Sequence, residues 1–224
     1  MMASGFQFRV CQNPECGLRY PLADGSGFGE RCPMCLSATV AASEGRLTVE
    51  QGMSEPRKPP APGWMAIVDN VRSAWNVGSI FRSAEGFAVE HLYLCGITPT
   101  PDDPSVKKTA LGAQDTVAWS SHRNAVTLVE ELKAKGSVIL ALEKTPTSHE
   151  IENSMERHLL KAPCVLVVGN EQAGIDPGIL GLADRVMHIE MLGRKRSYNV
   201  AIAFSIAAFA ITRQMGRGET LGLH

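Results

Sequence analysis

Residues 64–87, "WMAIVDNVRSAWNVGSIFRSAEGF", join a continuous apolar run to a segment with helical periodicity. The apolar run predicts a buried strand, and the segment from Asn76 to Phe87 predicts the helix that follows it. The same alternation continues with the apolar runs "HLYLCGI", "SVILALE", "CVLVVGN" and "RVMHIEM" and the helical patterns "AVTLVEELKAKG", "PGILGLAD" and a long last helix from about residue 199. This alternation predicts an α/β domain with a parallel sheet covered by helices on both faces.

Four of the six cysteines lie before this domain, within 25 residues of each other. Their spacing is C-x4-C, fifteen residues, then C-x2-C, and each pair is close to Gly or Pro. Two such pairs can present four thiolates tetrahedrally to zinc, and so short a segment has few apolar residues with which to fold unaided. The sequence thus predicts a small structural zinc ribbon held by Cys11, Cys16, Cys32 and Cys35. The alternative is that these cysteines only pack, as Cys95 and Cys164 are expected to do in the sheet.

A segment with four prolines between residues 56 and 62 separates the two parts and is typical of a semi-rigid linker. We therefore predict a zinc-ribbon-like module over 1–45, a linker over 46–62 and an α/β domain over 63–224. The longest apolar run, 199–212, contains Asn, Ser and Thr and is too short to cross a bilayer, so no membrane partner is expected. The first residues lack the pattern of a secretion signal, which favours the cytoplasm.

Net charge is −1, so bulk charge gives no sign of a nucleic-acid partner, and the clearest local basic run is "GRKRS" at 193–197. Ligands of open parallel sheets collect at the carboxyl ends of the strands. Three turns place polar residues there: "NVGSIFR" at 76–82, "VVGNEQAG" at 167–174 and "SYNV" at 197–200. Each alone is ordinary turn or helix-capping chemistry.

Together, in this order, the three turns resemble motifs 1, 2 and 3 of the SpoU (TrmH) branch of the SPOUT RNA methyltransferases. The matches are N-x-G-x-x-x-R, with Asn76, Gly78 and Arg82; G-x-E-x-x-G, with Gly169, Glu171 and Gly174; and S-x-N-V, with Ser197, Asn199 and Val200. The resemblance covers 64 to about 216, and "KKTALGAQDTVAW" at 107–119 is similar to the segment between motifs 1 and 2. The sequence departs from the family pattern at Ala88, Glu190 and Tyr198.

The resemblance implies a C-terminal deep trefoil knot, a homodimer with its site at the subunit interface, and S-adenosylmethionine as cofactor. It also implies methyl transfer to a ribose 2′-hydroxyl of tRNA or rRNA. By position, the cofactor-binding residues are expected to be Leu142, Gly169, Gly174, Ile189, Met191 and Tyr198. The catalytic group is expected to be Arg82, oriented together with the hydroxyl by Asn76, Glu171, Ser197 and Asn199.

Arg82 has no acidic residue beside it in its motif, which suggests that its partner is RNA. A guanidinium keeps its proton at neutral pH, so we expect Arg82 to bind the phosphate next to the target ribose and not to act as a base. In the zinc module, RNA contact is expected from Arg9, Arg19, Tyr20 and Arg31. Two alternatives stay open: a non-catalytic RNA-binding protein with the same fold, and a related enzyme that methylates a base. A dinucleotide-binding oxidoreductase is disfavoured because no G-x-G-x-x-G follows the first strand.

Overall fold

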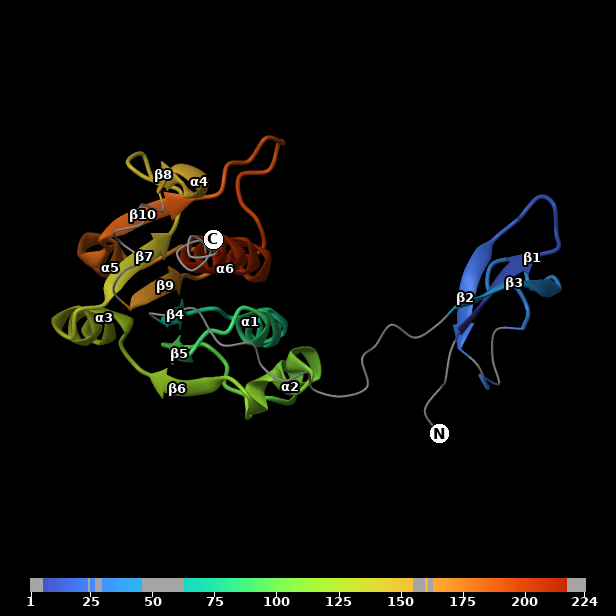
Figure 1. The fold of residues 1–224 in the computed structure, drawn as a ribbon, viewed down its shortest axis with the longest axis horizontal. Helices are drawn as coiled ribbons and strands as arrows, with labels where there is room; N and C mark the ends of the chain where they lie inside the picture. The colour runs from blue at the N-terminus through green and yellow to red at the C-terminus, as the bar shows by residue number, and fades with distance from the viewer. Residues whose placement is uncertain are drawn as a thin grey trace, which may run out of the picture. The chain divides into compact units, whose positions relative to one another are not determined.

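The computed structural model describes residues 6–23, 25–26, 30–45, 63–154, 160 and 163–216. The chain divides into two compact units, Met1–Arg57 and Lys58–His224. Each is described by itself (Figure 1). The predicted linker, 46–62, lies outside the described residues, and the predicted domain limits stay a prediction.

The N-terminal unit is a small antiparallel sheet with β1 (Phe6–Cys11) between β2 (Arg19–Ala23) and β3 (Thr39–Gly45). The pairing of β1 with β3 shifts register between Phe8 and Arg9. The Arg9 guanidinium lies against β3, where it donates to Thr39 Oγ1 at 2.7 Å and to the Thr39 carbonyl at 2.9 Å. Arg9 therefore stabilises the bulged sheet.

The C-terminal unit contains a seven-stranded sheet with the order β6-β5-β4-β9-β7-β10-β8, and every pairing among its described strands is parallel. The strands are β4 (Trp64–Asp69), β5 (His91–Cys95), β6 (Ala118–His122), β7 (Val138–Leu142), β8 (His149–Glu150), β9 (Cys164–Val168) and β10 (Arg185–His188). The helices are α1 (Ala74–Gly86), α2 (Pro104–Ala110), η1 (Ala113–Asp115), α3 (Ala125–Ala134), α4 (Ile151–Ser154), α5 (Pro177–Leu182) and α6 (Val200–Gly216).

Two apolar layers enclose the sheet, because its central strands are buried on both faces. On one face, Trp64 and Leu166 pack with the apolar sides of α1 and α6, and the ring of Trp64 stacks on Phe204 with centroids 6.4 Å apart. On the other face, Ile67 and Val167 pack with α3 and α5. Figure 1 shows the two helix pairs on opposite sides of the sheet. The predicted α/β architecture is confirmed, and the knotted path of the C-terminal segment stays a prediction.

Cys95 and Cys164 are buried in this sheet. Burial raises the pKa of each thiol to about 12, which suppresses the reactive thiolate. Both cysteines are therefore packing residues, as expected. Within the described residues, no helix is long and apolar enough to cross a membrane.

Candidate functional site

The three polar turns meet at one edge of the sheet, because they follow the parallel strands β4, β9 and β10. The turn after β4 leads into α1, which begins at Ala74, two residues earlier than the sequence predicts. Ser73 is the N-cap, and its Oγ accepts a hydrogen bond from the Asn76 backbone N–H at 3.3 Å. The cap satisfies the backbone N–H of Asn76, while the Asn76 side chain points away from the helix and contacts the other two turns.

Glu171, from the turn after β9, binds the start of α1. Its carboxylate accepts hydrogen bonds from the backbone N–H groups of Arg72 at 3.1 Å and Ser73 at 3.2 Å, and from Asn76 Nδ2 at 3.0 Å. Burial alone would raise the pKa of Glu171, but these hydrogen bonds and one from its own backbone outweigh burial and lower it. A carboxylate at a helix N-terminus also interacts favourably with the helix dipole. Glu171 is thus an ionised residue that fixes two turns together.

Asn199, from the turn before α6, completes the connection. Its Nδ2 donates to Asn76 Oδ1 at 3.0 Å, while its Oδ1 accepts from the Ala201 backbone N–H at 2.9 Å at the start of α6. Asn76 therefore links Glu171, 95 residues away, to Asn199, 123 residues away. We call this row of three side chains the Glu171–Asn76–Asn199 chain. It brings the three sequence motifs together in space.

The glycines of the second turn permit a close approach of backbone segments. A Cβ on Gly169 would lie 2.6 Å from the Ile175 nitrogen, and a Cβ on Gly174 would lie 2.5 Å from Glu143 Oε2. Gly174 also has φ of +74°, which an L side chain adopts with difficulty. Both glycines therefore keep the loop folded back on itself, with Asn170 and Gly174 exchanging backbone hydrogen bonds at 3.0 Å.

Gly78, in the first turn, has a different use. It is buried where α1 crosses α2, and a Cβ there would clash with the Thr109 hydroxyl and lie 2.5 Å from the Val106 carbonyl oxygen. The group that approaches its backbone is therefore helix α2. The close contact fixes the position of α1, and with it Asn76 and Arg82.

A cavity of about 400 Å³ opens beside the Glu171–Asn76–Asn199 chain. Four of the predicted cofactor-binding residues line it, Leu142, Gly169, Ile189 and Tyr198, and so do the predicted site residues Glu171, Ser197 and Asn199. Gly174, Met191, Asn76 and Arg82 are not among the lining residues. Polar and apolar residues line it in similar measure, and its volume is within the range of cavities that bind small molecules.

Seven further residues line the cavity, and the polar ones among them, Glu143, Lys144, Asn170 and His188, were not predicted as site residues from the sequence. Glu143 accepts a hydrogen bond from the Ile175 backbone N–H at 3.1 Å and so braces the second turn. Asn170 donates to the Asn70 carbonyl at 2.7 Å and connects the ends of β9 and β4. A signal existed for Glu143, because a charged residue directly follows the buried strand "VILAL".

Arg82 lies on the exposed side of α1. Within the described part of the chain, no hydrogen bond or ion pair engages its guanidinium, and the one ion pair found there joins Lys133 and Asp184 at 2.5 Å. That Arg82 binds RNA stays a prediction.

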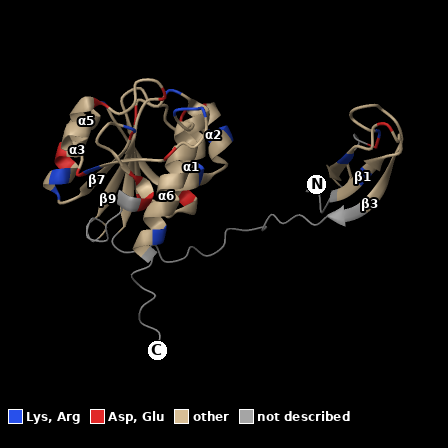
Figure 2. Ribbon diagram, turned by 90° about the horizontal axis from the view of Figure 1, so that it is seen from above, with Lys and Arg blue, Asp and Glu red and all other residues tan. Residues whose placement is uncertain are grey.

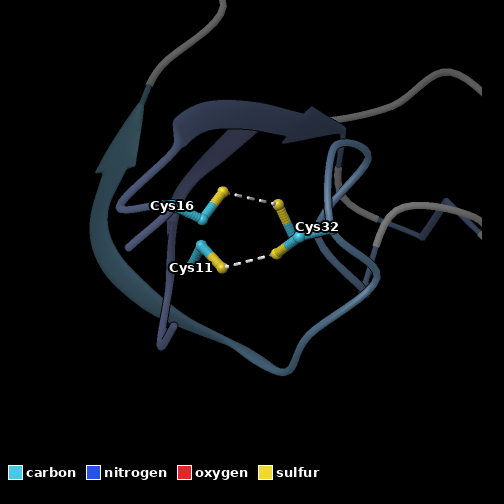
Figure 3. A group of neighbouring side chains, drawn as sticks. Cys11, Cys16 and Cys32 are labelled. Carbon is cyan, nitrogen blue, oxygen red and sulfur yellow. Dashed lines mark hydrogen bonds between the residues drawn. The ribbon is translucent and has the colours of Figure 1, made fainter. Parts of the chain in front are cut away.

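The four N-terminal cysteines form a separate cluster (Figure 3). Their sulfur atoms all lie within 4.8 Å of one another, with Cys11 and Cys35 at 3.4 Å and Cys16 and Cys32 at 3.6 Å. A tetrahedral site with Zn–S bonds of about 2.3 Å places its sulfurs about 3.8 Å apart. The cluster therefore has the size and donor set that zinc requires.

The chain resembles known RNA-modifying proteins over its C-terminal unit. Residues 64–209 match the family model described as "SpoU rRNA Methylase family". A "tRNA (guanosine(18)-2′-O)-methyltransferase" of Escherichia coli K12 is 28% identical over 153 residues, which is 68% of this chain and 64% of that protein. A protein with the same name from Aquifex aeolicus is 31% identical over 158 residues, 67% of this chain and 69% of that protein. The chain thus spans just under two thirds of the E. coli protein.

Solved structures agree with this match. The "AdoMet bound rRNA methyltransferase from Sinorhizobium meliloti" superposes with a TM-score of 0.63 at 25% identity, over 70% of this chain and 58% of that chain. The family match, residues 64–209, includes every strand of the seven-stranded sheet and all three turns. The chain belongs to the SpoU methylase family.

Proposed function

We propose that this protein transfers a methyl group from S-adenosylmethionine to a ribose 2′-hydroxyl of tRNA or rRNA. The observation that carries the proposal is the Glu171–Asn76–Asn199 chain, which joins three turns that are distant in the sequence and lies beside the cavity. Its middle residue, Asn76, is on α1, the helix that also bears Arg82. Relatives with matching sequence are named as 2′-O-methyltransferases of tRNA, and a structural neighbour is named as an AdoMet-bound rRNA methyltransferase.

The cavity is where we place the cofactor. Leu142, Gly169, Ile189 and Tyr198 line it and would hold the adenosyl part, and Ser197 is also among the lining residues. Met191 and Gly174, which do not line the cavity, are proposed to contact the cofactor from the neighbouring turns. S-adenosylmethionine supplies an electrophilic methyl group there. The lining residues include two carboxylates, Glu143 and Glu171, and one cationic residue, Lys144.

Methylation of the ribose requires its 2′-oxygen to be held in line with the methyl group and to lose a proton. Arg82 stays charged and therefore acts as an anchor for the phosphate beside the target ribose and stabilises negative charge that develops on the oxygen. The amide of Asn76 is hydrogen-bonded to Glu171 on one side and to Asn199 on the other. These bonds hold the start of α1 in a fixed position relative to the other two turns. The proton passes to the bound phosphate or to solvent.

The proposal includes a homodimer in the cytoplasm. Helix α6 supports a dimer, because Ile202 and Phe209 lie two turns apart on one side of it and are each more than half exposed. Such a face is costly to leave in water. A second copy that covers α6 would lie next to the turn that carries Ser197 and Asn199.

The N-terminal unit is proposed to bind structural zinc through its four cysteines and to assist RNA binding. Arg9 is the poorest candidate for RNA contact, because Thr39 and Gln7 already engage its guanidinium. Arg19 lies over the half-exposed ring of Phe8, with 5.9 Å from its Cζ to the ring centroid, and offers a combined cationic and aromatic surface. Tyr20 and Arg31 adjoin each other through a hydrogen bond from the tyrosine hydroxyl to the arginine carbonyl.

The decisive test replaces Arg82 by alanine. We expect S-adenosylmethionine binding, measured by calorimetry, to change less than about threefold, while transfer of a tritiated methyl group to unmodified RNA falls by at least about 100-fold, as for loss of one transition-state charge contact. Arg123→Ala, a similarly exposed arginine outside the cavity, is the control and should keep both properties. Equal loss of binding and transfer in Arg82→Ala would contradict the assigned role. A wild-type protein that binds RNA but transfers no methyl group would contradict the function itself.

A further inference from the structure

An exposed tryptophan lies directly before Asn76 on α1. Trp75 has 58% of its surface accessible, whereas Trp64 is fully buried and Trp119 is half-buried. Tryptophan is usually well buried, so an indole this open calls for a ligand or partner. Lys108, from α2, lies with its Nζ 5.6 Å from the centroid of the indole ring, within the range of a cation–π contact. The lysine approaches the ring, and much of the indole remains open.

The position of Trp75 relates it to the proposed reaction. Arg82 follows it by seven residues, which is close to two helical turns, so both side chains leave α1 on the same side. Ser79, between them, turns its hydroxyl back onto the Trp75 carbonyl at 2.9 Å and leaves no bulky group in the way. An RNA strand whose phosphate binds Arg82 would therefore pass along α1 over Trp75.

The charges around Trp75 favour a polyanion. Lys107 and Lys108 are exposed on α2, and Arg72 is exposed just before α1. Figure 2 shows basic positions on α2 in blue. Glu85, in the last turn of α1, is the only acidic residue within α1 and α2. In the described part of the chain none of these cations forms an ion pair. A second copy of this chain would bring the same cations to the contact, which makes it a poorer occupant than RNA.

We propose that Trp75 and Lys108 form a subsite for a nucleobase adjacent to the target ribose. The base stacks on the open indole, and the ammonium group of Lys108 contacts the neighbouring phosphate. Proteins that bind single-stranded RNA commonly stack unpaired bases on aromatic side chains. This inference rests on the proposed function, because it takes the RNA to be the substrate whose ribose reaches Arg82.

The first test measures methyl transfer as a function of RNA concentration. Trp75→Ala should raise the KM for RNA by about 5- to 150-fold, which is what loss of one stacked base is worth, with a smaller change in kcat. Trp75→Tyr keeps an aromatic face and should stay within about threefold of wild type, whereas Trp75→Leu keeps apolar area without that face and should resemble Trp75→Ala. Ile97→Ala, which removes another apolar side chain of similar exposure, is the control and should leave the KM unchanged. Cofactor binding should not change in any variant.

The second test does not depend on turnover. A short single-stranded RNA oligonucleotide should quench the tryptophan fluorescence of wild type, because Trp75 is the exposed indole of the three. Trp75→Phe should lose most of the quenching while it binds the oligonucleotide within about threefold of wild type in a filter-binding assay. Lys108→Ala should lower the slope of log affinity against log salt by about one.

The outcomes separate this inference from the function on which it rests. Unchanged KM and unchanged oligonucleotide affinity in Trp75→Ala, with an active wild type, would overturn the subsite alone. An inactive wild type whose fluorescence is still quenched would overturn the proposed function and keep the RNA subsite. If Trp75→Ala instead turns a dimer into a monomer in light scattering and binds the oligonucleotide as wild type does, the surface is a protein interface and the inference is wrong.

Discussion

Replacing Gly78 by alanine should destabilise the C-terminal unit, although alanine is the better helix former. The new Cβ would meet the Thr109 hydroxyl, which could rotate away, and would lie 2.5 Å from the Val106 carbonyl oxygen and 2.9 Å from the Ala110 nitrogen, which could not. Helices α1 and α2 would have to separate to relieve these contacts. The same substitution at Gly86, in the last turn of α1, meets no atom within 4 Å and provides the matched control.

The expected magnitudes follow from two opposing effects. Overpacking costs about 1–3 kcal/mol, and a clash with backbone belongs at the upper end, about 3 kcal/mol. Alanine in place of glycine gains about 1 kcal/mol in a helix interior. The net loss for Gly78→Ala is thus about 2 kcal/mol, which lowers the Tm of a domain of this size by roughly 4–8 °C. Gly86→Ala should raise it by about 1–4 °C, since only the gain applies.

Thermal unfolding followed by circular dichroism at 222 nm, with wild type and both variants at one protein concentration, measures the difference. Because α1 carries Asn76 and Arg82, Gly78→Ala should also lower methyl transfer more than cofactor binding. A Tm for Gly78→Ala that is raised as much as that of Gly86→Ala would refute the reasoning. In that case α2 does not constrain α1, and the glycine of the first motif has some other use.

Two further predictions concern Glu171 and the cysteine cluster. Glu171→Gln should lower the free energy of unfolding by about 1 kcal/mol at pH 7, because an amide accepts hydrogen bonds at only one of its two terminal atoms. The pKa of Glu171 in the folded protein lies below its ordinary value of 4.5, so this difference should be fully present above about pH 5 and should vanish as the pH falls through the folded pKa. A difference that does not change with pH in urea titrations would contradict this prediction. Elemental analysis should find about one zinc ion per chain. Cys35→Ser should lower the zinc content, and the control Cys95→Ala should not. Full zinc content in Cys35→Ser would rule out binding by four sulfurs.

The alternation of strands and helices in the sequence was enough to predict the sheet, because buried parallel strands must be apolar throughout and the helices between them must be amphipathic. It was also enough to locate the polar turns, since carboxyl ends of parallel strands share one edge. It did not predict that Asn76 would be the residue common to the other two turns. Hydrogen bonds between side chains more than 90 residues apart depend on the loops' final paths, which periodicity does not contain.

The use of Gly78 was equally hidden. A glycine in the first motif suggests a close approach to its backbone, but a single sequence does not distinguish a glycine that makes room for a ligand from one that makes room for a helix. The exposure of Trp75 could not be predicted either, because a tryptophan on an amphipathic helix is normally part of the core. Its exposure follows from the rotation of α1, which is set by the burial of Val77, Ile80 and Phe81 on the opposite side.

The Glu171–Asn76–Asn199 chain has a consequence for how the protein matures on the ribosome. Asn76 is synthesised early, Glu171 only 95 residues later, and Asn199 28 positions after Glu171. The nascent polypeptide can therefore build several strands and pack α1 against α2 while the Asn76 side chain still lacks both partners, because contacts of such long sequence separation form late. A chain that stops before α6 would lose one apolar wall of the sheet together with the helix start that holds Asn199.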